Sequence, residues 1–559
     1  MTIRDRAAQL VWPWILGDYV AEGSAEWTRI TRLVREQHVG GFIMSVGSPL
    51  DIAAKANALQ RQSQLPLLIS ADMETGVGFR ARGGYFLPNA IDLGGATTFP
   101  LQMALGATRD SALAYAFGRA TAQEARALGI HIAFNPVLDV NNNPANPVIG
   151  ARAFSEDARL TAMLGAANIR GLQDGGVLAT GKHFPGHGDT ETNSHLALSV
   201  VRASRERLDS LELVPFRAAI GAGVGAIMTF HGFLPALDSS GVPATLSPRV
   251  MTDLLRKSLG FQGLLVTDAM DMKGVVDTYG AAEAAKRAIA AGNDVLLMPS
   301  DVSATIDAVV SGVSEGRYSE AQLNASVRRV LALKVRFHLN SDRQVSLERV
   351  RAIVGDSSHQ RLAEEVAERS IVLARDATSS VPISGTAGRA PKLAVVTYAR
   401  RADLGAGTSF LAEVRRSVPQ VAHVWMNADE DAPRTEAADR AIDGADLVVI
   451  CNYLNINSES ATAAAPSAFA DFVNSVVARG KSVVLISFGT PYLLQQVPSV
   501  PTYMVAWGGG AASQRAAARA LVGRRPITGK LPISIPPLLP YGSGVQRPAL
   551  SQNTTTRPD

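Results

Sequence analysis

Short apolar runs alternate with longer amphipathic segments over roughly the first 340 residues. Apolar positions recur with the period of a helix in the segments 52–61, 101–128, 158–172, 208–220, 249–259 and 281–291. The apolar runs predict eight strands, at residues 10–15, 41–44, 67–71, 131–137, 177–183, 226–231, 264–268 and 294–298. Because strands and helices alternate, neighbouring strands should pair in parallel. This pattern predicts a (β/α)8 barrel, with a doubly wound open sheet as the alternative.

The rhythm changes after residue 340. A helical segment at 359–371 and a polar turn region at 378–388 precede a second alternating block. Its strands are expected at residues 392–397, 422–425, 446–452, 482–488 and 502–507. We therefore predict an α/β protein with a catalytic (β/α)8 barrel at 1–340, a helical connector at 341–390, a smaller open α/β sandwich domain at 391–545 and a disordered tail at 546–559.

The composition excludes several classes of protein. Of the 559 residues, 47% are hydrophobic and 19% charged, which is typical of a globular enzyme. The net charge of +4 comes from dispersed residues, so nothing supports nucleic-acid binding. The single cysteine, Cys451, excludes an internal disulfide and a cysteine-rich metal site. No other metal-ligand motif occurs, so we expect no metal and no cofactor.

No membrane span is expected, because no apolar run approaches the ~20 residues that cross a bilayer. The N-terminus shows no export signal in the chain as given. A chain with neither feature is expected in the cytoplasm, or in the periplasm or outside the cell if a signal was removed. The oligomeric state stays open.

One loop, at residues 181–195, carries an unusual density of ionisable groups. It holds three of the nine histidines, one lysine, two acids and three glycines. An apolar run precedes it, so the loop should begin at the end of a strand. Four other predicted strands also end in polar residues, at Asp72, Asn135, His231 and Asp268. In a barrel the carboxyl ends of the strands open onto one face, so these groups should form one site there.

The motif Lys-His-Phe-Pro-Gly-His-Gly at 182–188 resembles a signature of family 3 glycoside hydrolases, in the β-N-acetylhexosaminidase branch. Other segments on both sides of this motif resemble the family in the same order along the chain, at 72–76 with Arg80, 135–139, 149–154, 228–231, 243–247, 260–268 and 291–294. The segments 487–492 and 529–532 resemble the C-terminal domain of the family more loosely. The resemblance implies a retaining glycosidase, which needs a carboxylate nucleophile and a separate proton donor.

By this resemblance Asp268 is the nucleophile, although an aspartate before a helix is also a common N-cap. His195 is the proton donor, since an imidazole can both give and take a proton near neutral pH. His187 is equally compatible with a structural hydrogen bond and a substrate contact. His231 is expected in a supporting role more than a catalytic one. The expected substrate-binding residues are Asp72, Arg80, Arg152, Lys182, His183, Met228 and His231.

One position departs from the family pattern. The branch usually places an aspartate two residues before the histidine, and this chain has Asn193 there. An amide can orient the ring of His195 but cannot supply the charge that stabilises an imidazolium. Asp189 and Glu191 are nearby, and our hypothesis is that one of them partners His195. The second explanation is that the aglycone of the substrate, or the molecule that accepts the sugar, differs.

The expected function is a retaining exo-β-N-acetylhexosaminidase that releases terminal β-linked N-acetylglucosamine from amino-sugar glycans, such as peptidoglycan or chitin fragments. A β-N-acetylglucosaminide phosphorylase or a β-glucosidase of the same fold is the alternative. A sugar-binding protein without hydrolytic activity is the alternative from a different class. Asn193 favours this last alternative and Asp268 opposes it.

Overall fold

The computed structural model describes residues 1–83, 94–193, 198–383, 391–430, 436–454 and 465–550. It divides into two compact units. The first comprises residues 1–98 and 110–362, and the second comprises residues 99–109 together with the described residues from 363 onward. His195 and residues 551–559 of the predicted tail lie outside the described residues.

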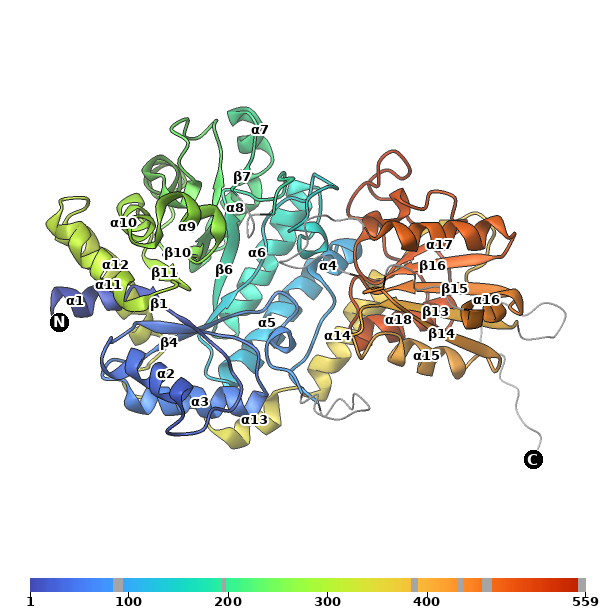
Figure 1. The fold of residues 1–559 in the computed structure, drawn as a ribbon, viewed down its shortest axis with the longest axis horizontal. Coiled ribbons are helices and arrows are strands. Elements are labelled where there is room, and N and C mark those ends of the chain that lie inside the picture. Colours follow the sequence, from blue (N-terminus) through green and yellow to red (C-terminus); the bar gives the residue numbers. More distant parts are fainter. Residues whose placement is uncertain (84–93, 194–197, 384–390, 431–435, 455–464, 551–559) are drawn as a thin grey trace. The chain divides into compact units, whose positions relative to one another are not determined.

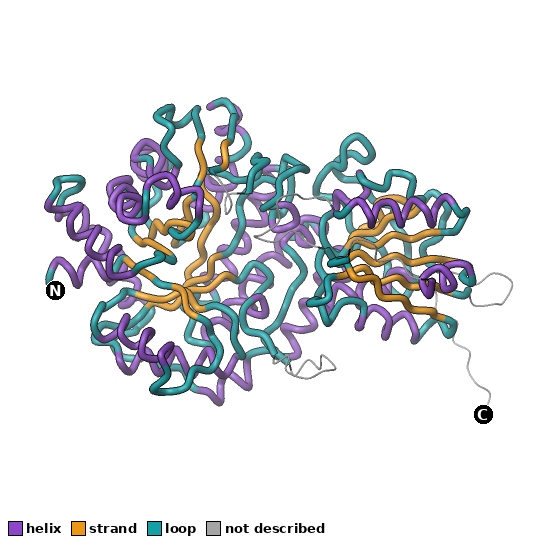
Figure 2. The backbone as a smooth tube through the Cα atoms, in the orientation of Figure 1, coloured by secondary structure: helices purple, strands orange, loops and turns teal. Residues whose placement is uncertain are grey.

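The first unit is a closed parallel barrel with helices around it (Figures 1 and 2). Its strand order is β1-β11-β10-β8-β6-β5-β4-β3-β2. The bounds are β1 (Val11–Trp12), β2 (Trp14–Ile15), β3 (Gly41–Met44), β4 (Leu68–Asp72), β5 (Ile132–Phe134), β6 (Leu178–Phe184), β8 (Ala226–Thr229), β10 (Leu264–Ala269) and β11 (Val295–Leu297). The predicted barrel fold is confirmed.

The first predicted strand, at residues 10–15, is divided into two short strands, and together they close the barrel. Pro13 separates β1 from β2, and β1 pairs with β11 whereas β2 pairs with β3. A proline has no N–H to donate, so it interrupts the ladder at this point. Its carbonyl still accepts a hydrogen bond from the Ile43 N–H at 2.9 Å. The same short run of chain therefore joins both edges of the sheet.

The strands are buried on both faces, which explains their nearly continuous apolar sequences. In β10, Leu264 and Val266 belong to one hydrophobic cluster, and Leu265 belongs to the other. The surrounding helices are α1 (Ile3–Ala8), α2 (Ala25–Arg35), α3 (Pro49–Gln62), α5 (Ser111–Ala127), α6 (Ala158–Asp174), α7 (Arg205–Ser210), α8 (Leu213–Gly221), a π-helix (Arg249–Ser258), α9 (Lys273–Tyr279), α10 (Ala281–Ala291), α11 (Val302–Ser314), α12 (Glu320–Arg336) and α13 (Leu347–Ile353). A short ladder of β7 (Ser199–Val200) and β9 (Gly232–Phe233) follows β6 and β8.

The predicted helical segment 101–128 is two helices. Helix α4 (Gln102–Thr108) ends at Arg109, which has a left-handed φ of 56°. Asp110 then caps α5, and its carboxylate accepts hydrogen bonds from the N–H groups of Ala112 and Leu113. In a continuous helix these N–H groups would bond to carbonyls of the preceding turn. At the start of a helix that turn is missing, and the aspartate side chain accepts from them instead, so a new helix begins here. Helix α4 belongs to the second unit, whereas α5 belongs to the barrel.

The second unit is a smaller open α/β sheet with helices on both sides (Figure 2). Its strand order is β12-β17-β16-β15-β13-β14, and only β12 is antiparallel to its neighbour. The strands are β12 (Val372–Asp376), β13 (Leu393–Ala399), β14 (Val421–Asn427), β15 (Leu447–Asn452), β16 (Val483–Ser487) and β17 (Thr502–Val505). The helices are α15 (Thr408–Arg415), α16 (Glu436–Asp443), α17 (Ser467–Ala478) and α18 (Ala511–Leu521), and α14 (Ser357–Ser370) leads into this unit.

The open α/β architecture predicted for this part of the chain is confirmed. Strand β12 was not expected, since the helical pattern before it and the polar turn after it obscure its short apolar run. Within the described residues, none of the helices combines the length and the apolar character needed to cross a membrane.

The amino ends of β10 and β11 are held by one buried carboxylate, which generates a prediction. Asp294 is fully buried and pairs with Arg256 at 2.6 Å and Arg329 at 2.9 Å. Removing it leaves the Arg256 charge buried without its partner, so Asp294→Ala should lower the free energy of unfolding of the barrel unit by about 3 kcal/mol. Urea unfolding measures this loss. The matched control is Asp253→Ala, whose partner Lys257 is exposed, and it should change stability by less than ~0.5 kcal/mol. Equal losses in both variants would contradict the prediction.

Candidate active site

The carboxyl ends of five neighbouring strands, β4, β5, β6, β8 and β10, deliver most of the predicted site residues. Asp72 ends β4, Lys182 and His183 lie in β6, Met228 lies in β8 and Asp268 lies in β10. These strands follow one another in the sheet. Parallel strands place their carboxyl ends on the same edge, so residues up to about 200 positions apart in the chain gather on one face of the barrel.

A network of five charged side chains occupies part of this face. The Lys182 ammonium lies 3.0 Å from an Asp72 oxygen and 2.8 Å from a Glu74 oxygen. Arg80 donates to the other Asp72 oxygen at 2.7 Å. Arg152 donates to both Glu74 oxygens, at 2.8 and 2.7 Å. Lys182 and Glu74 are buried, whereas Asp72, Arg80 and Arg152 keep about a quarter of their side chains exposed. The exposed members are the ones that a ligand can contact.

Each charge in the network is stabilised by its neighbours. Burial alone would raise the pKa of Asp72, but the charges of Lys182 and Arg80 lower it to about 2. Burial likewise opposes the ionised form of Glu74, and Arg152 and Lys182 bring its pKa well below the usual value. For Lys182, burial lowers the pKa, but Glu74 and Asp72 outweigh that effect and raise it. All these groups therefore stay charged around neutral pH.

A second buried carboxylate arranges the histidines of the loop that follows β6. Asp139 accepts hydrogen bonds from the His183 ring at 2.7 Å and from the His187 backbone N–H at 2.7 Å. It is fully buried, which would raise its pKa, but the two histidines lower it. The arrangement fixes His183 Nδ1 on the protein side and orients the ring from β6.

The ring and the backbone of His187 both make contacts within the protein. Its ring is buried, its Nδ1 lies 2.9 Å from the Thr190 hydroxyl, and its plane packs on Phe230 at a centroid distance of 4.1 Å. Asn146 donates to the His187 carbonyl at 2.8 Å. Burial lowers the pKa of His187 to about 3, so the ring is neutral. The Thr190 hydroxyl also lies 3.2 Å from the His187 carbonyl, so it ties the ring to the backbone of the same residue.

Glu74 and Asp139 lie within the family motifs at 72–76 and 135–139, but the sequence alone indicates no role for either acid. A signal was present in both cases, since each acid follows a buried strand whose carboxyl end opens onto the site. Local sequence does not reveal which cation each acid meets. Arg152 lies 78 positions from Glu74, and His183 lies 44 positions from Asp139.

Asp268 lies near the end of β10, and its side chain is partly exposed. Its Oδ1 accepts a hydrogen bond from the Ala269 N–H at 2.8 Å. Met228 is buried in the ladder between β8 and β10, opposite Val266. His231 is fully buried, and its two ring nitrogens lie 2.8 Å from the Thr245 hydroxyl and 3.0 Å from the Ala269 carbonyl. Both nitrogens of His231 are thus engaged by the protein itself.

The loop that carries the expected proton donor is described as far as Asn193, which is buried. Asp189 lies 3.5 Å from the guanidinium of Arg207, and Glu191 is exposed. His195 lies outside the described residues, so a pairing with Asp189 or Glu191 stays a prediction.

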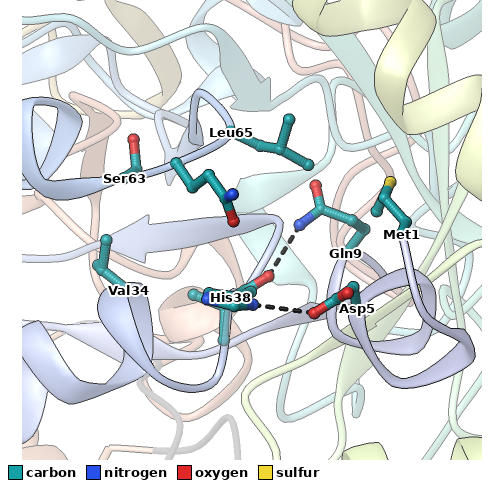
Figure 3. Close-up of a pocket in the computed structure, with 9 residues that line it drawn as sticks. Met1, Asp5, Gln9, Val34, His38, Ser63 and Leu65 are labelled. Carbon is teal, nitrogen blue, oxygen red and sulfur yellow. Dashed lines mark hydrogen bonds and ion pairs between the residues drawn. The ribbon is translucent and has the colours of Figure 1, made fainter.

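A cavity of about 210 Å³ lies elsewhere on the barrel (Figure 3). Gln9 donates to the His38 carbonyl at 2.8 Å there, and the His38 ring pairs with Asp5 at 2.9 Å. Its lining residues precede β1, β3 and β4 in the chain, so they lie at the amino ends of the strands. This cavity is therefore separate from the carboxyl-end face that carries the charged network.

Comparison with known proteins identifies the family. Residues 2–333 match the model of the glycosyl hydrolase family 3 N-terminal domain, and residues 186–556 match that of the family 3 C-terminal domain. The chain belongs to glycosyl hydrolase family 3. As a family 3 protein it is a glycoside hydrolase, an enzyme whose substrate is a carbohydrate.

Three relatives of this family 3 enzyme bear names of related activities. The chain is 31% identical over 530 residues to a β-N-acetylglucosaminidase/β-glucosidase of Cellulomonas fimi, covering 90% of this chain and 89% of the relative. It is 35% identical over 373 residues to β-hexosaminidase A of Pseudoalteromonas piscicida, covering 61% and 60% of the two chains. The structure of a family 3 β-N-acetylglucosaminidase from Paenibacillus sp. str. FPU-7 superposes with a TM-score of 0.81, at 33% identity, over 96% of this chain and 99% of that one.

The neutral His187 generates a pH prediction. An unfolded histidine titrates near pH 6.5, whereas the folded ring titrates near 3. Between these values only the unfolded state binds the proton, so the free energy of unfolding falls with decreasing pH, by up to about 1.4 kcal/mol per pH unit. His187→Gln removes this titration. Between pH 6.5 and about 5 the other titrating groups are common to both proteins, so the thermal midpoint of the wild type should fall more steeply than that of the variant. Parallel slopes would contradict the assignment.

Proposed function

We propose that this enzyme is a retaining exo-β-N-acetylglucosaminidase that releases terminal N-acetylglucosamine from amino-sugar glycans such as peptidoglycan or chitin fragments. The observation that carries the proposal is the position of Asp268. Its partly exposed carboxylate ends a strand on the face that holds the network of Asp72, Lys182 and Arg152. The names of the relatives support the same activity.

In the proposed reaction Asp268 attacks the anomeric carbon of the terminal sugar. His195 gives its proton to the glycosidic oxygen as the bond to the leaving group breaks, which produces a glycosyl ester on Asp268. His195 then takes a proton from water, and the resulting attack on the anomeric carbon frees Asp268 and the sugar with retained configuration. The role of His195 rests on the family resemblance.

The charged network is suited to holding the sugar. We assign Asp72, Arg80 and Arg152 to hydroxyl or carbonyl groups of the sugar, with Lys182 and His183 beside them. Asp72, with its pKa near 2, accepts hydrogen bonds as a carboxylate at any working pH. Arginine and lysine donors hold oxygen atoms in fixed directions, which keeps the anomeric carbon in line with Asp268. Met228 lies in β8 and His231 follows that strand, and both are buried, so we assign them a supporting role.

The first test is the release of nitrophenol from p-nitrophenyl β-N-acetylglucosaminide and from p-nitrophenyl β-glucoside. The wild type should prefer the N-acetyl sugar, and nuclear magnetic resonance should show the β-anomer as the first product. Asp268→Asn should lower kcat by about 10⁴-fold or more, as removal of a covalent nucleophile does in other enzymes.

Preference for the glucoside would replace the proposed specificity with that of a β-glucosidase. Retained sugar binding without turnover by the wild type would support a binding protein instead.

Asn193 favours a second candidate, a phosphorylase. An uncharged amide beside the acid/base repels a phosphate anion less than the aspartate that the family usually has. Release of N-acetylglucosamine 1-phosphate that depends on added phosphate would establish this reaction, and unchanged rates with phosphate would exclude it.

The substitution at Asn193 also generates a prediction about the proton donor. In a serine protease the comparable change from aspartate to asparagine costs about 10⁴ in rate. If Asp189 or Glu191 supplies the missing charge, one of the variants Asp189→Ala and Glu191→Ala should lose at least about 10-fold in kcat, and Asn193→Asp should change little. Asp189 already pairs with Arg207, which favours Glu191. A large gain in Asn193→Asp with no loss in either alanine variant would show that neither acid compensates.

A further inference from the structure

The strand that carries Asp268 loses its regular pairing just before that residue. Strand β10 pairs with β8 from Leu264 to Val266, and the last pair is Val266 with Met228. On the other side the register with β11 shifts between Val266 and Ala269. Between these pairs β10 advances three residues and β11 two, as in a β-bulge, which re-aims side chains and leaves part of the backbone outside the ladder. The backbone around Asp268 therefore needs other contacts to hold it.

Side chains supply those contacts on both sides of the strand. Toward β11, the Thr267 hydroxyl accepts a hydrogen bond from the Leu297 N–H at 3.1 Å. Toward β8, the ring of His231 reaches the Ala269 carbonyl, with Nε2 at 3.0 Å from the oxygen. His231 thus makes the cross-strand link that the β8 backbone no longer makes beyond Met228.

The hydrogen bonds fix the tautomer of His231. A carbonyl oxygen has no proton to give, so Nε2 must carry one and donate it to Ala269. Burial lowers the pKa of the ring, so it is neutral and Nδ1 is the acceptor. The Thr245 hydroxyl, 2.8 Å away, donates to Nδ1 and accepts in turn from the Thr229 hydroxyl at 3.1 Å. The Phe230 carbonyl competes for the same Thr245 proton at 2.9 Å.

The backbone of Ala269 connects this chain of hydrogen bonds to the nucleophile. Its carbonyl accepts from His231, and its N–H donates to Asp268 Oδ1 at 2.8 Å. A displacement of this residue by a fraction of an ångström moves the carboxylate relative to the anomeric carbon. Such displacements are costly, since a misplacement of about 1 Å can reduce a rate about 10²-fold.

We propose that His231 is a positioning residue for Asp268, acting through the backbone of Ala269, and that Thr245 sets the ring tautomer. The proposal rests on the proposed function. A direct contact with the sugar is not its role, because the ring is fully buried and both nitrogens are engaged by the protein.

The test compares His231→Asn with His231→Gln on two substrates, the p-nitrophenyl and 2,4-dinitrophenyl β-N-acetylglucosaminides. The glutamine amide reaches the position of Nε2 and can donate to Ala269, whereas the shorter asparagine cannot. His231→Asn should lower kcat by about 10- to 100-fold with little change in KM, and His231→Gln should recover most of that loss. Dinitrophenolate leaves without a proton. A defect in the nucleophile therefore lowers kcat equally for both substrates, whereas a defect in the proton donor leaves kcat for the dinitrophenyl substrate unchanged.

Two further variants keep the result interpretable. His131→Asn changes another buried histidine, whose Nδ1 accepts the Ile69 N–H at 3.0 Å at the amino end of β5. It should lower the thermal midpoint without lowering kcat. Thr245→Val leaves His231 in place but removes the hydroxyl that orients its ring. It should lower kcat, as His231→Asn does. If His231→Asn does not fold, the kcat of Thr245→Val tests the positioning role instead.

Several outcomes would overturn the proposal. These are an unchanged kcat in His231→Asn, a loss confined to the p-nitrophenyl substrate, and an equal loss of kcat in the folded His131→Asn control. A folded His231→Gln that recovers nothing would also overturn it. A wild type that cleaves neither substrate would show that the proposed function itself is wrong, and the inference would fail with it.

Discussion

A buried ammonium group determines much of the active-site face. Lys182 lies near the carboxyl end of β6 with 2% of its side chain exposed, and a buried cation requires nearby carboxylates. Asp72 and Glu74 meet that need, and they in turn need Arg80 and Arg152. Asp72 ends β4, Glu74 and Arg80 follow that strand, Arg152 follows β5, and Lys182 lies in β6. The charge balance around one lysine therefore ties three adjacent strands together at their carboxyl ends.

The two halves of the face are built by different physical means. Around Lys182, ion pairs between side chains hold the groups that would bind the sugar. Around Asp268, backbone geometry matters more, because a bulge takes the residue out of the ladder and neutral hydrogen bonds hold the strand end.

Much of the fold was predictable from sequence because apolar runs and helical periods report burial directly. The polar strand ends and the family motifs located Asp72, Lys182 and Asp268 on one face. Other features depend on contacts between distant residues, which no local pattern encodes. The roles of Glu74 and Asp139 are not evident from the sequence, since their partners Arg152 and His183 are far along the chain. The split at Pro13 and the new helix at Asp110 depend on single residues that an apolar pattern overlooks.

The assignment of residues 99–109 to the second unit makes that unit discontinuous in the chain. Helix α4 is buried there, and the Leu101 N–H bonds to the Trp507 carbonyl, about 400 residues later in the sequence. A chain cut after residue 362 would keep α4 and lose the surface that covers Met103 and Leu105. The second unit is thus not an appendage that can be trimmed from the barrel. During synthesis, α4 must wait for nearly the whole chain before it can fold into place.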